Sequence, residues 1–327
     1  MSVTEQVGRQ AIRVTNQIVN TAVLVVILLL LTVGCYAIWD TNQVYSRAEA
    51  TRYADYEPSS AAGVLSFQEL QAINPEVISW VVVFGTQIDY PVTQGPDNVK
   101  YLNTDAKGEY SLSGSIFLDY ENSPDFSDFN SILFGHHMNQ DAMFGDIGLF
   151  EDKSYFDARE YGTIYYNGQE HGIEFFALVQ ADAYDEVVYR PNVLGWQNQQ
   201  NYLDLLTRDA IQTRNSVSVT PNDRIVLLST CSESATNGRD ILVGKITDDV
   251  RPNPFGTGPT DDAKTNPAAS PFQNLWERQS LPVKIVLAGA PIALIALAVV
   301  LVVRKRSIRR SLEEMRQQAM RGTDEHS

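Results

Sequence analysis

The chain has 327 residues and a formal net charge of −15 at pH 7, with 40 acidic against 25 basic residues. This acidity argues against a nucleic-acid-binding protein, and the length allows one or two domains. Two cysteines cannot build a disulfide framework, and two cysteines with four histidines do not supply the clusters of a structural zinc site.

The first predicted element is an uncharged apolar stretch at residues 18–38, which includes Cys35. As a helix it would be about 30 Å long, enough to cross a bilayer. A cleavable signal peptide is the alternative, but Trp39 and Asp40 follow the stretch in place of the small residues of a cleavage site. We therefore expect an uncleaved transmembrane helix, preceded by a cytoplasmic tail at residues 1–17.

Residues 39–65 are polar and charged, and we expect them to form a helical stalk outside the membrane. Ser66 and Glu69 then have the spacing of a capping box. This spacing predicts a short helix that begins at Ser66 and ends before Pro75.

Residues 66–250 are expected to form a mainly β domain, because short runs rich in β-branched and aromatic residues alternate with turn sequences. Such a pattern predicts a barrel or a sandwich, and Asn167-Gly168 predicts a hairpin turn. The predicted strands lie at residues 77–84, 87–94, 114–120, 131–137, 163–167, 172–180, 223–230 and 240–246.

Two helices are predicted to interrupt the strands. One lies near residues 141–159. The other covers residues 198–214, and its buried stripe would be formed by Tyr202, Leu205, Leu206 and Ile211.

The composition changes after residue 250. Residues 251–283 are rich in proline and glycine and predict an extended linker. A second apolar run at residues 284–303 predicts another transmembrane helix, and a basic tail at residues 304–327 follows it. Basic residues flank both apolar runs on their outer sides, so the positive-inside rule places both termini in the cytoplasm and the central domain outside the cell.

Cys231 directly follows the apolar run at residues 223–230. A free cysteine is often a small buried hydrophobic residue, and that interpretation stays open. A cysteine at the exit of a rigid strand is also well placed for chemistry. Its thiol would need a neighbouring base or cation to become a nucleophile, since an ordinary cysteine has a pKa of about 8.5.

His136 and His137 follow another apolar run directly after Gly135, and a histidine there could act as the base. Arg239 begins the next strand after Cys231, which we expect to pair beside it at about 4.8 Å. An arginine in that place could hold the oxyanion of an acyl-transfer reaction. Solvated loop histidines, a surface arginine, and a metal site formed by Cys231 with a histidine are the alternatives.

These motifs resemble those of the sortases, and of class B sortases in particular. The segments "LLSTC" with "GRDILVGKI", "FGHHM" with "MFGD", and "VISWVVVFGTQIDYPVTQGPDNVKYLN" with "GSIFLDY" are similar to blocks of that family and stand in its order, over about residues 66–247. The resemblance implies a sortase-like β-barrel with added helices, here flanked by two transmembrane helices, and no cofactor or metal. It also implies a catalytic His136, Cys231 and Arg239, and substrate contacts at Asn98, Leu102 and Ser229.

The resemblance implies a membrane-anchored cysteine transpeptidase that cleaves the C-terminal sorting signal of surface proteins after a threonine. A thioacyl-enzyme would then react with an amine of a lipid-linked peptidoglycan precursor of a Gram-positive cell wall. A pilin-polymerising sortase is an alternative, because a second membrane helix is more familiar among those enzymes. A cysteine hydrolase with the same triad, and a catalytically inactive receptor with a buried Cys231, also remain open.

Two routes could generate the nucleophile. His136 could take the proton of a neutral thiol, or a thiolate–imidazolium pair could exist beforehand in a minor fraction of molecules. The sequence does not choose between them, and it leaves the role of Glu233 open.

Overall fold

The computed structural model of the chain describes residues 3–58, 63–138, 142–231 and 237–256. The first 40 residues belong to one compact unit, and residues 41–267 belong to another. The predicted second transmembrane helix at residues 284–303 and the basic tail lie outside the described residues.

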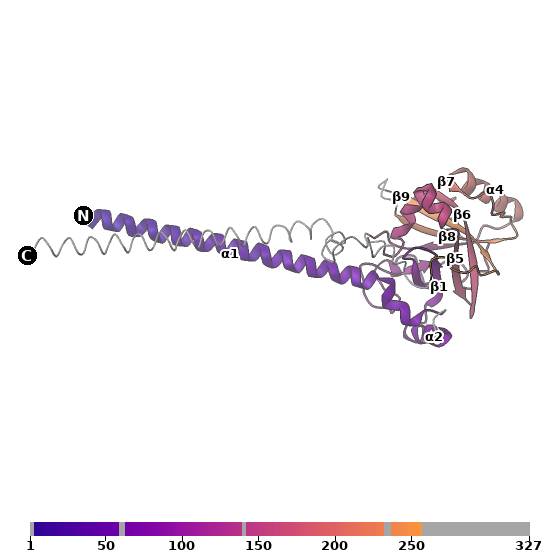
Figure 1. The fold of residues 1–327 in the computed structure, drawn as a ribbon, viewed down its shortest axis with the longest axis horizontal. Coiled ribbons are helices and arrows are strands. Elements are labelled where there is room, and N and C mark those ends of the chain that lie inside the picture. Colours follow the sequence, from indigo (N-terminus) through magenta and orange to yellow (C-terminus); the bar gives the residue numbers. More distant parts are fainter. Residues whose placement is uncertain (1–2, 59–62, 139–141, 232–236, 257–327) are drawn as a thin grey trace, which may run out of the picture. The chain divides into compact units, whose positions relative to one another are not determined.

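Helix α1 (Val3–Ala48) covers the predicted transmembrane helix and extends it at both ends (Figure 1). Within α1, residues Thr15–Trp39 have a mean hydropathy of 2.7 and are 0% buried. The part of the chain that the structure describes thus contains one helix that is long and apolar enough to cross a membrane. Length and composition fit either a membrane anchor or a signal sequence. A 3-10 helix, η1 (Ala50–Tyr56), follows α1.

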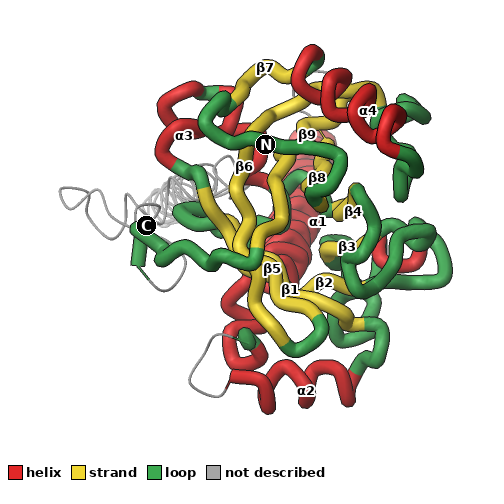
Figure 2. The backbone as a smooth tube through the Cα atoms, turned by 90° about the vertical axis from the view of Figure 1, so that its right-hand side faces the viewer, coloured by secondary structure: helices red, strands yellow, loops and turns green. Residues whose placement is uncertain are grey.

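A closed ring of eight strands forms the body of the described part of residues 41–267. The order around the ring is β5-β1-β2-β3-β4-β8-β9-β6, and a pairing of β6 with β5 closes it into a barrel (Figure 2). Each of the eight predicted strands is present. Their bounds are β1 (Val77–Val83), β2 (Asp89–Thr93), β3 (Ile116–Leu118), β4 (Asn130–Phe134), β5 (Tyr161–Tyr166), β6 (Gln169–Asp182), β8 (Arg224–Cys231) and β9 (Gly238–Thr247).

The hairpin between β5 and β6 confirms the turn predicted at Asn167-Gly168. Both residues have positive φ, 51° and 78°, as a two-residue hairpin turn of this hand requires. A further strand that the sequence did not predict, β7 (Ala210–Thr213), pairs with the second half of β6 outside the ring.

Helix α2 (Gly63–Ile73) ends before Pro75, as predicted, but the predicted capping box is wrong. Ser66 lies inside the helix, which begins three residues earlier. Phe67 and Leu70 are buried in the barrel core, so core packing stabilises this helix in addition to its local sequence. Helices α2 and α4 (Trp196–Arg208) lie on opposite sides of the barrel (Figure 2).

The helix predicted near residues 141–159 is two short helices, η4 (Gly145–Glu151) and α3 (Lys153–Ala158). Asp152 separates them, because its carboxylate accepts the Tyr155 N–H at 3.0 Å and caps the second helix.

The helix predicted at residues 198–214 ends at Arg208, so Ile211 was wrongly assigned to its buried stripe. Ile211 lies in β7 and is 43% exposed, whereas Tyr202 and Leu206 are buried as predicted. Hydrogen bonds between β7 and β6 stabilise an extended backbone there and override the helical pattern.

Both faces of β8 are buried, which explains its continuous apolar sequence. Val226 and Leu228 pack into the barrel core, while Ile225 and Leu227 pack into a second cluster with residues of α4. Strand β8 is therefore rigid along its length, and its last residue is Cys231.

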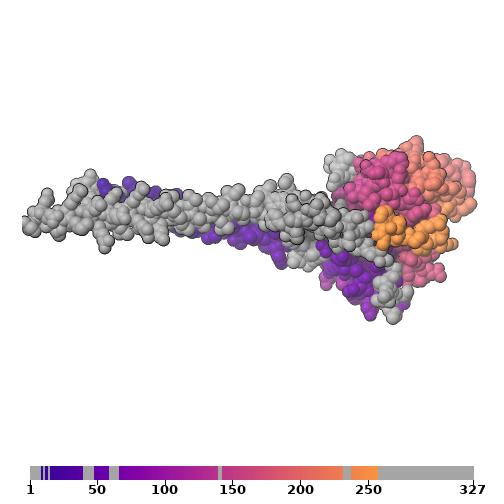
Figure 3. All heavy atoms as spheres, viewed as in Figure 1, coloured from indigo at the N-terminus to yellow at the C-terminus, as the bar shows by residue number. Residues whose placement is uncertain are grey.

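The residues directly after β9 pack on the barrel surface, where Figure 3 shows them in orange. The Phe255 ring lies so close to Gly85 that an added Cβ there would approach it within 2.8 Å. The Arg159 guanidinium lies 3.5 Å from the centre of the Tyr155 ring and 5.3 Å from that of Phe255. The first residues of the predicted linker thus contact the β-barrel.

Asp89, the first residue of β2, has a pKa raised to about 6. Burial is the main cause and the negative charge of Glu57 adds to it, while a hydrogen bond from the Trp80 indole at 2.7 Å acts in the opposite direction. An aspartate in an unfolded chain has a pKa of about 3.9, so the folded protein binds this proton more tightly than the unfolded chain does.

Replacing Asp89 by asparagine should therefore stabilise the protein at neutral pH. The folded state loses stability as the pH rises from about 4 to about 6, and the full cost is present above about pH 6. We expect Asp89→Asn to raise the free energy of unfolding by about 2 kcal/mol at about pH 7.5 and to change it little below about pH 4. Unfolding of the full chain in detergent micelles at both pH values measures this, and an equal effect at both would contradict the assignment.

Candidate active site

The strand register brings His136, Cys231 and Arg239 into one row. Strand β4 runs parallel to β8 with Phe134 beside Ser229, and the Gly135 N–H donates to the Ser229 carbonyl at 3.1 Å. The next residue, His136, therefore reaches the level of Cys231. Cys231 is in turn the register partner of Arg239 in the antiparallel pair of β8 and β9.

Neighbouring strands lie about 4.8 Å apart, and register partners in an antiparallel pair occupy the same face of a sheet. The three predicted catalytic positions are thus adjacent, although 95 and 8 residues of sequence separate them, as the numbering shows. Glu233 lies outside the described residues.

His136 is half-buried and is held at both its backbone and its ring. Its carbonyl accepts the Phe144 N–H at 3.1 Å, and its Nε2 lies 2.9 Å from the Leu102 carbonyl oxygen. Because a carbonyl oxygen only accepts hydrogen bonds, Nε2 must carry a proton and donate it. Nδ1 is then the ring nitrogen that can take or give a proton in a reaction.

Gly135 lets the backbone before His136 pass through a narrow space. A Cβ at this position would lie 2.5 Å from Ile116 Cδ1 and 2.6 Å from Phe144 Cδ2. Both neighbours are buried, so they have little room to move.

We therefore expect Gly135→Ala to destabilise the protein by about 1–3 kcal/mol and to displace His136. The matched control is Gly148→Ala, because a Cβ at Gly148 would meet only ordinary contacts, at 3.8 and 3.9 Å. Its free energy of unfolding should change by less than about 0.5 kcal/mol. Thermal unfolding of the two variants compares them, and equal stability of both would show that the space at Gly135 is not limiting.

Arg239 is half-buried, and its Nη1 donates to the Gly238 carbonyl at 3.0 Å. The next residue, Asp240, occupies the opposite face of β9 and is 1% exposed. Its Oδ1 accepts a hydrogen bond of 2.9 Å from Gln180, whose amide nitrogen also donates to Glu151 at 2.8 Å. Asp240 is not among the predicted site residues, and its one signal in the sequence is a charged residue at the start of an apolar strand.

Ser229 precedes Cys231 by two residues in β8, so it occupies the same face of the strand, and it is 2% exposed. Its hydroxyl is 2.8 Å from the hydroxyl of the half-buried Tyr189, and the Tyr189 ring stacks on Phe134 at 5.9 Å. Tyr189 therefore covers the Ser229 hydroxyl. Tyr189 is not among the predicted site residues.

Leu102 lies beside the row, because its carbonyl contacts His136, and its side chain is 36% exposed. Asn98 does not lie beside the row. Its amide donates to Asp119 at 2.8 Å and accepts from the Tyr120 N–H at 3.1 Å, directly after β3. Strand β3 is antiparallel to β4, so its end lies away from the end of β4 that leads to His136.

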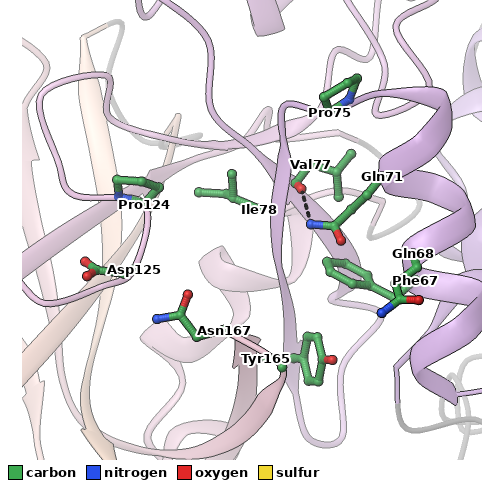
Figure 4. A pocket seen from close by; sticks show the side chains of 11 residues that line it. Phe67, Gln68, Gln71, Pro75, Val77, Ile78, Pro124, Asp125, Tyr165 and Asn167 are labelled. Atoms are coloured by element: carbon green, nitrogen blue, oxygen red, sulfur yellow. Dashed lines mark hydrogen bonds between the residues drawn. The ribbon is translucent and has the colours of Figure 1, made fainter.

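A surface pocket of about 370 Å³ lies elsewhere on the barrel, between α2, β1 and the turn that joins β5 to β6 (Figure 4). That turn precedes β6, and the opposite end of β6 pairs with the start of β9 beside the row. The pocket contains none of the predicted site residues. It is lined by Phe67, Gln68, Gln71, Pro75, Val77, Ile78, Pro124, Asp125, Tyr165, Asn167 and Gly168.

The chain is similar to known sortases in sequence and structure. It is 31% identical over 211 residues to sortase B of Listeria monocytogenes, a match that covers 63% of this chain and 82% of that protein. A crystal structure of sortase B from the type II pilus of Streptococcus pneumoniae is 48% identical, with a TM-score of 0.50, and the match covers 56% of this chain and 99% of that one.

A mutant form of Clostridium perfringens sortase B in which a serine replaces a cysteine is 33% identical, with a TM-score of 0.58. That match covers 62% of this chain and 98% of the solved one. No family model matches the chain. The sequence identity over most of a known sortase B and the shared barrel lead to one conclusion: the chain belongs to the class B sortases, a family of cysteine transpeptidases.

Proposed function

We propose that the chain is a membrane-anchored transpeptidase that cleaves the sorting signal of surface proteins after a threonine and joins the new carboxyl group to an amine. The observation that carries the proposal is the row of His136, Cys231 and Arg239 across β4, β8 and β9, in a chain that belongs to the class B sortases. A nucleophile, a base and a cation at adjacent strand ends are the groups that acyl transfer requires.

In the first half of the reaction, the Cys231 sulfur attacks the threonine carbonyl as its proton passes to His136 Nδ1. Nε2 keeps its hydrogen bond to the Leu102 carbonyl throughout, and this fixes the orientation of the ring. Arg239 holds the negative charge that develops on the carbonyl oxygen. The imidazolium then protonates the leaving amine, the scissile C–N bond breaks, and a thioester remains.

In the second half, an amine attacks the thioester and gives a proton to His136. A new amide bond forms, the C–S bond breaks, and the thiol recovers its proton. The amine that we propose belongs to a lipid-linked peptidoglycan precursor, and the enzyme itself needs no cofactor for these steps.

Helix α1 supports a location at the membrane, and we propose that the catalytic domain lies outside the cell. Its apolar segment, Thr15–Trp39, is long enough to span a bilayer. We propose that the apolar run at residues 284–303 forms a second span and that both termini are cytoplasmic. Anchoring would confine the enzyme to the surface where membrane-retained substrates and lipid-linked precursors meet, which raises their effective concentration.

A pilin-polymerising activity is the second candidate function. The observation that favours it is the 48% identity to a sortase B from a type II pilus. In that case the acceptor amine would be a lysine side chain of a pilin subunit instead of a peptidoglycan amine.

The experiment uses the full chain in detergent micelles. It is incubated with a library of threonine-containing sorting peptides and with two acceptors, a peptidoglycan stem peptide and a lysine-containing pilin peptide. Mass spectrometry should find a peptide cleaved after threonine and joined to an amine, and the preferred acceptor decides between the two candidates. Release of the free acid alone, in the presence of excess amine, would instead identify a hydrolase. Absence of any threonine cleavage would refute the proposal.

A further inference from the structure

The last residue of α1 and the residues of η1 contact both segments that hold His136. One contact passes through the hydroxyl of Tyr90, on β2, and leads to the segment after the histidine. The other passes through η1 and leads to the loop directly after a short 3-10 helix, η2 (Lys100–Leu102). All of these residues belong to the unit formed by residues 41–267.

The Tyr90 hydroxyl joins two backbone groups that are far apart in the sequence. It donates to the carbonyl of Ala48, which is the last residue of α1, at 2.8 Å. It accepts the Met143 N–H at 3.0 Å. The three residues are 2%, 0% and 3% exposed and belong to one core cluster, so water does not compete for these two hydrogen bonds.

Met143 connects directly to the histidine segment. It forms an isolated antiparallel bridge with His137, and the N–H of the following residue, Phe144, donates to the His136 carbonyl. Met143 has a φ of 58°, in the left-handed region that non-glycine residues rarely adopt. Such a conformation persists only where its surroundings fix it, and the Tyr90 hydroxyl bonds the amide of that very residue.

The second contact involves η1. Arg52 Nη1 lies 3.1 Å from Oδ2 of Asp105, whose side chain is 0% exposed, and the Lys107 ammonium lies 4.8 Å from the centre of the Tyr56 ring. Asp105 and Lys107 lie in the loop that follows η2, and the carbonyl of Leu102, the last residue of η2, accepts the hydrogen bond of His136 Nε2. The segment from Ala48 to Tyr56 therefore contacts the loops on both sides of the histidine.

We infer that Tyr90 is a positioning residue: its hydroxyl ties the segment after His136 to the end of α1 and holds the imidazole in line with Cys231. The inference rests on the proposed function for the role of His136. In this arrangement the peptide does not touch Tyr90. Loss of the hydroxyl would leave the Met143 N–H and the Ala48 carbonyl buried without this partner, and the strained residue would lose a constraint.

The test is Tyr90→Phe in the full chain, in detergent micelles. The substitution removes one oxygen and keeps the ring, so the core packing stays. We expect the turnover of a sorting peptide to fall about 10- to 100-fold, because a small misplacement of a catalytic group has effects of this size, while KM changes less than about twofold. The amide hydrogen of Met143 should also exchange faster with solvent than it does in the unaltered protein.

Tyr166→Phe is the matched control. Tyr166 is a buried tyrosine, 3% exposed, whose hydroxyl accepts a hydrogen bond from Arg224 at 2.9 Å. Arg224 begins β8, at the opposite end from Cys231. This variant should lose one hydrogen bond, where Tyr90→Phe loses two, and should keep both the turnover and the protection of Met143. Both variants are compared at a temperature where they are fully folded.

Turnover of Tyr90→Phe within about twofold of the unaltered protein would overturn the inference, and so would an equal loss in both variants. Amide exchange of Met143 needs no substrate, so it separates this inference from the proposed function. A chain that cleaves no sorting peptide refutes the function, while unchanged exchange at Met143 in Tyr90→Phe refutes the positioning role.

Discussion

Replacing Cys231 by alanine is expected to abolish the covalent adduct between the chain and a sorting peptide. Alanine has no nucleophile, and acyl transfer without an acyl-enzyme would require direct attack by the acceptor amine. Removal of the nucleophile from a comparable catalytic set leaves little more than the effects of binding and oxyanion stabilisation, a loss of about 10⁶-fold in turnover. Intact-mass spectrometry of the chain after incubation with peptide measures the adduct.

The chain offers a matched control in its other cysteine. Cys35 lies within the apolar segment of α1, so Cys35→Ala should form the adduct at the rate of the unaltered protein. An adduct that persists in Cys231→Ala and disappears in Cys35→Ala would place the nucleophile in the wrong part of the molecule and remove the basis of the mechanism.

Replacing Arg239 by alanine should slow formation of the same adduct by about 10²- to 10³-fold. The reason is the loss of a cation from the place where the carbonyl oxygen gains negative charge, and single oxyanion donors typically contribute this much. KM for the peptide should change far less than turnover, since the charge exists only in the transition state. Arg239→Lys should recover only part of the rate, because an ammonium cannot reproduce the planar fork of a guanidinium.

Arg251→Ala serves as the control for a general effect of charge. Arg251 follows the opposite end of β9 and pairs with Glu174 and Asp249 on the barrel surface, at 3.7 and 3.2 Å. It should leave the rate of adduct formation unchanged. If Arg239→Ala also forms the adduct at an unchanged rate, Arg239 has no part in oxyanion stabilisation.

The role of Arg239 depends on register more than on sequence distance. A shift of one residue between β8 and β9 would move it to the opposite face of the sheet. Asp240 occupies that opposite face and is buried, with Gln180 as its hydrogen-bond donor. Gln180 is the register partner of Asp240 in the pair of β6 and β9. The buried aspartate therefore fixes the register of β9 against β6, because a shift between these two strands would carry its carboxylate away from this partner.

The substrate contacts are less simple than the resemblance implies. Ser229 is buried and its hydroxyl is hydrogen-bonded to that of Tyr189. The Asn98 amide donates a hydrogen bond to Asp119, away from the row of His136, Cys231 and Arg239. Contact of Asn98, Leu102 and Ser229 with substrate stays a prediction. Leu102 has the most direct connection to the site, through its carbonyl and His136.

Patterns with a short period were readable in the sequence. The eight strands of the ring follow from runs of β-branched and aromatic residues, and the hairpin at Asn167-Gly168 follows from two residue types that tolerate positive φ. The apolar segment of α1 follows from length and composition. The pairing of Cys231 with Arg239 was also predictable, because the two strands are consecutive and the segment between them is short.

Contacts between distant segments were decided only by the tertiary structure. Nothing near Tyr90 in the sequence indicates that its hydroxyl joins Ala48 to Met143, since these residues are 42 and 53 positions away. Strand β7 has a helical pattern in the sequence, but its hydrogen bonds with β6 hold it extended. Helix α2 begins three residues before Ser66, its apparent cap. Local sequence determines which backbone conformations have a low free energy. The parallel pairing of β4 with β8, which sets His136 beside Cys231, depends instead on a barrel that closes only when all its strands are in place.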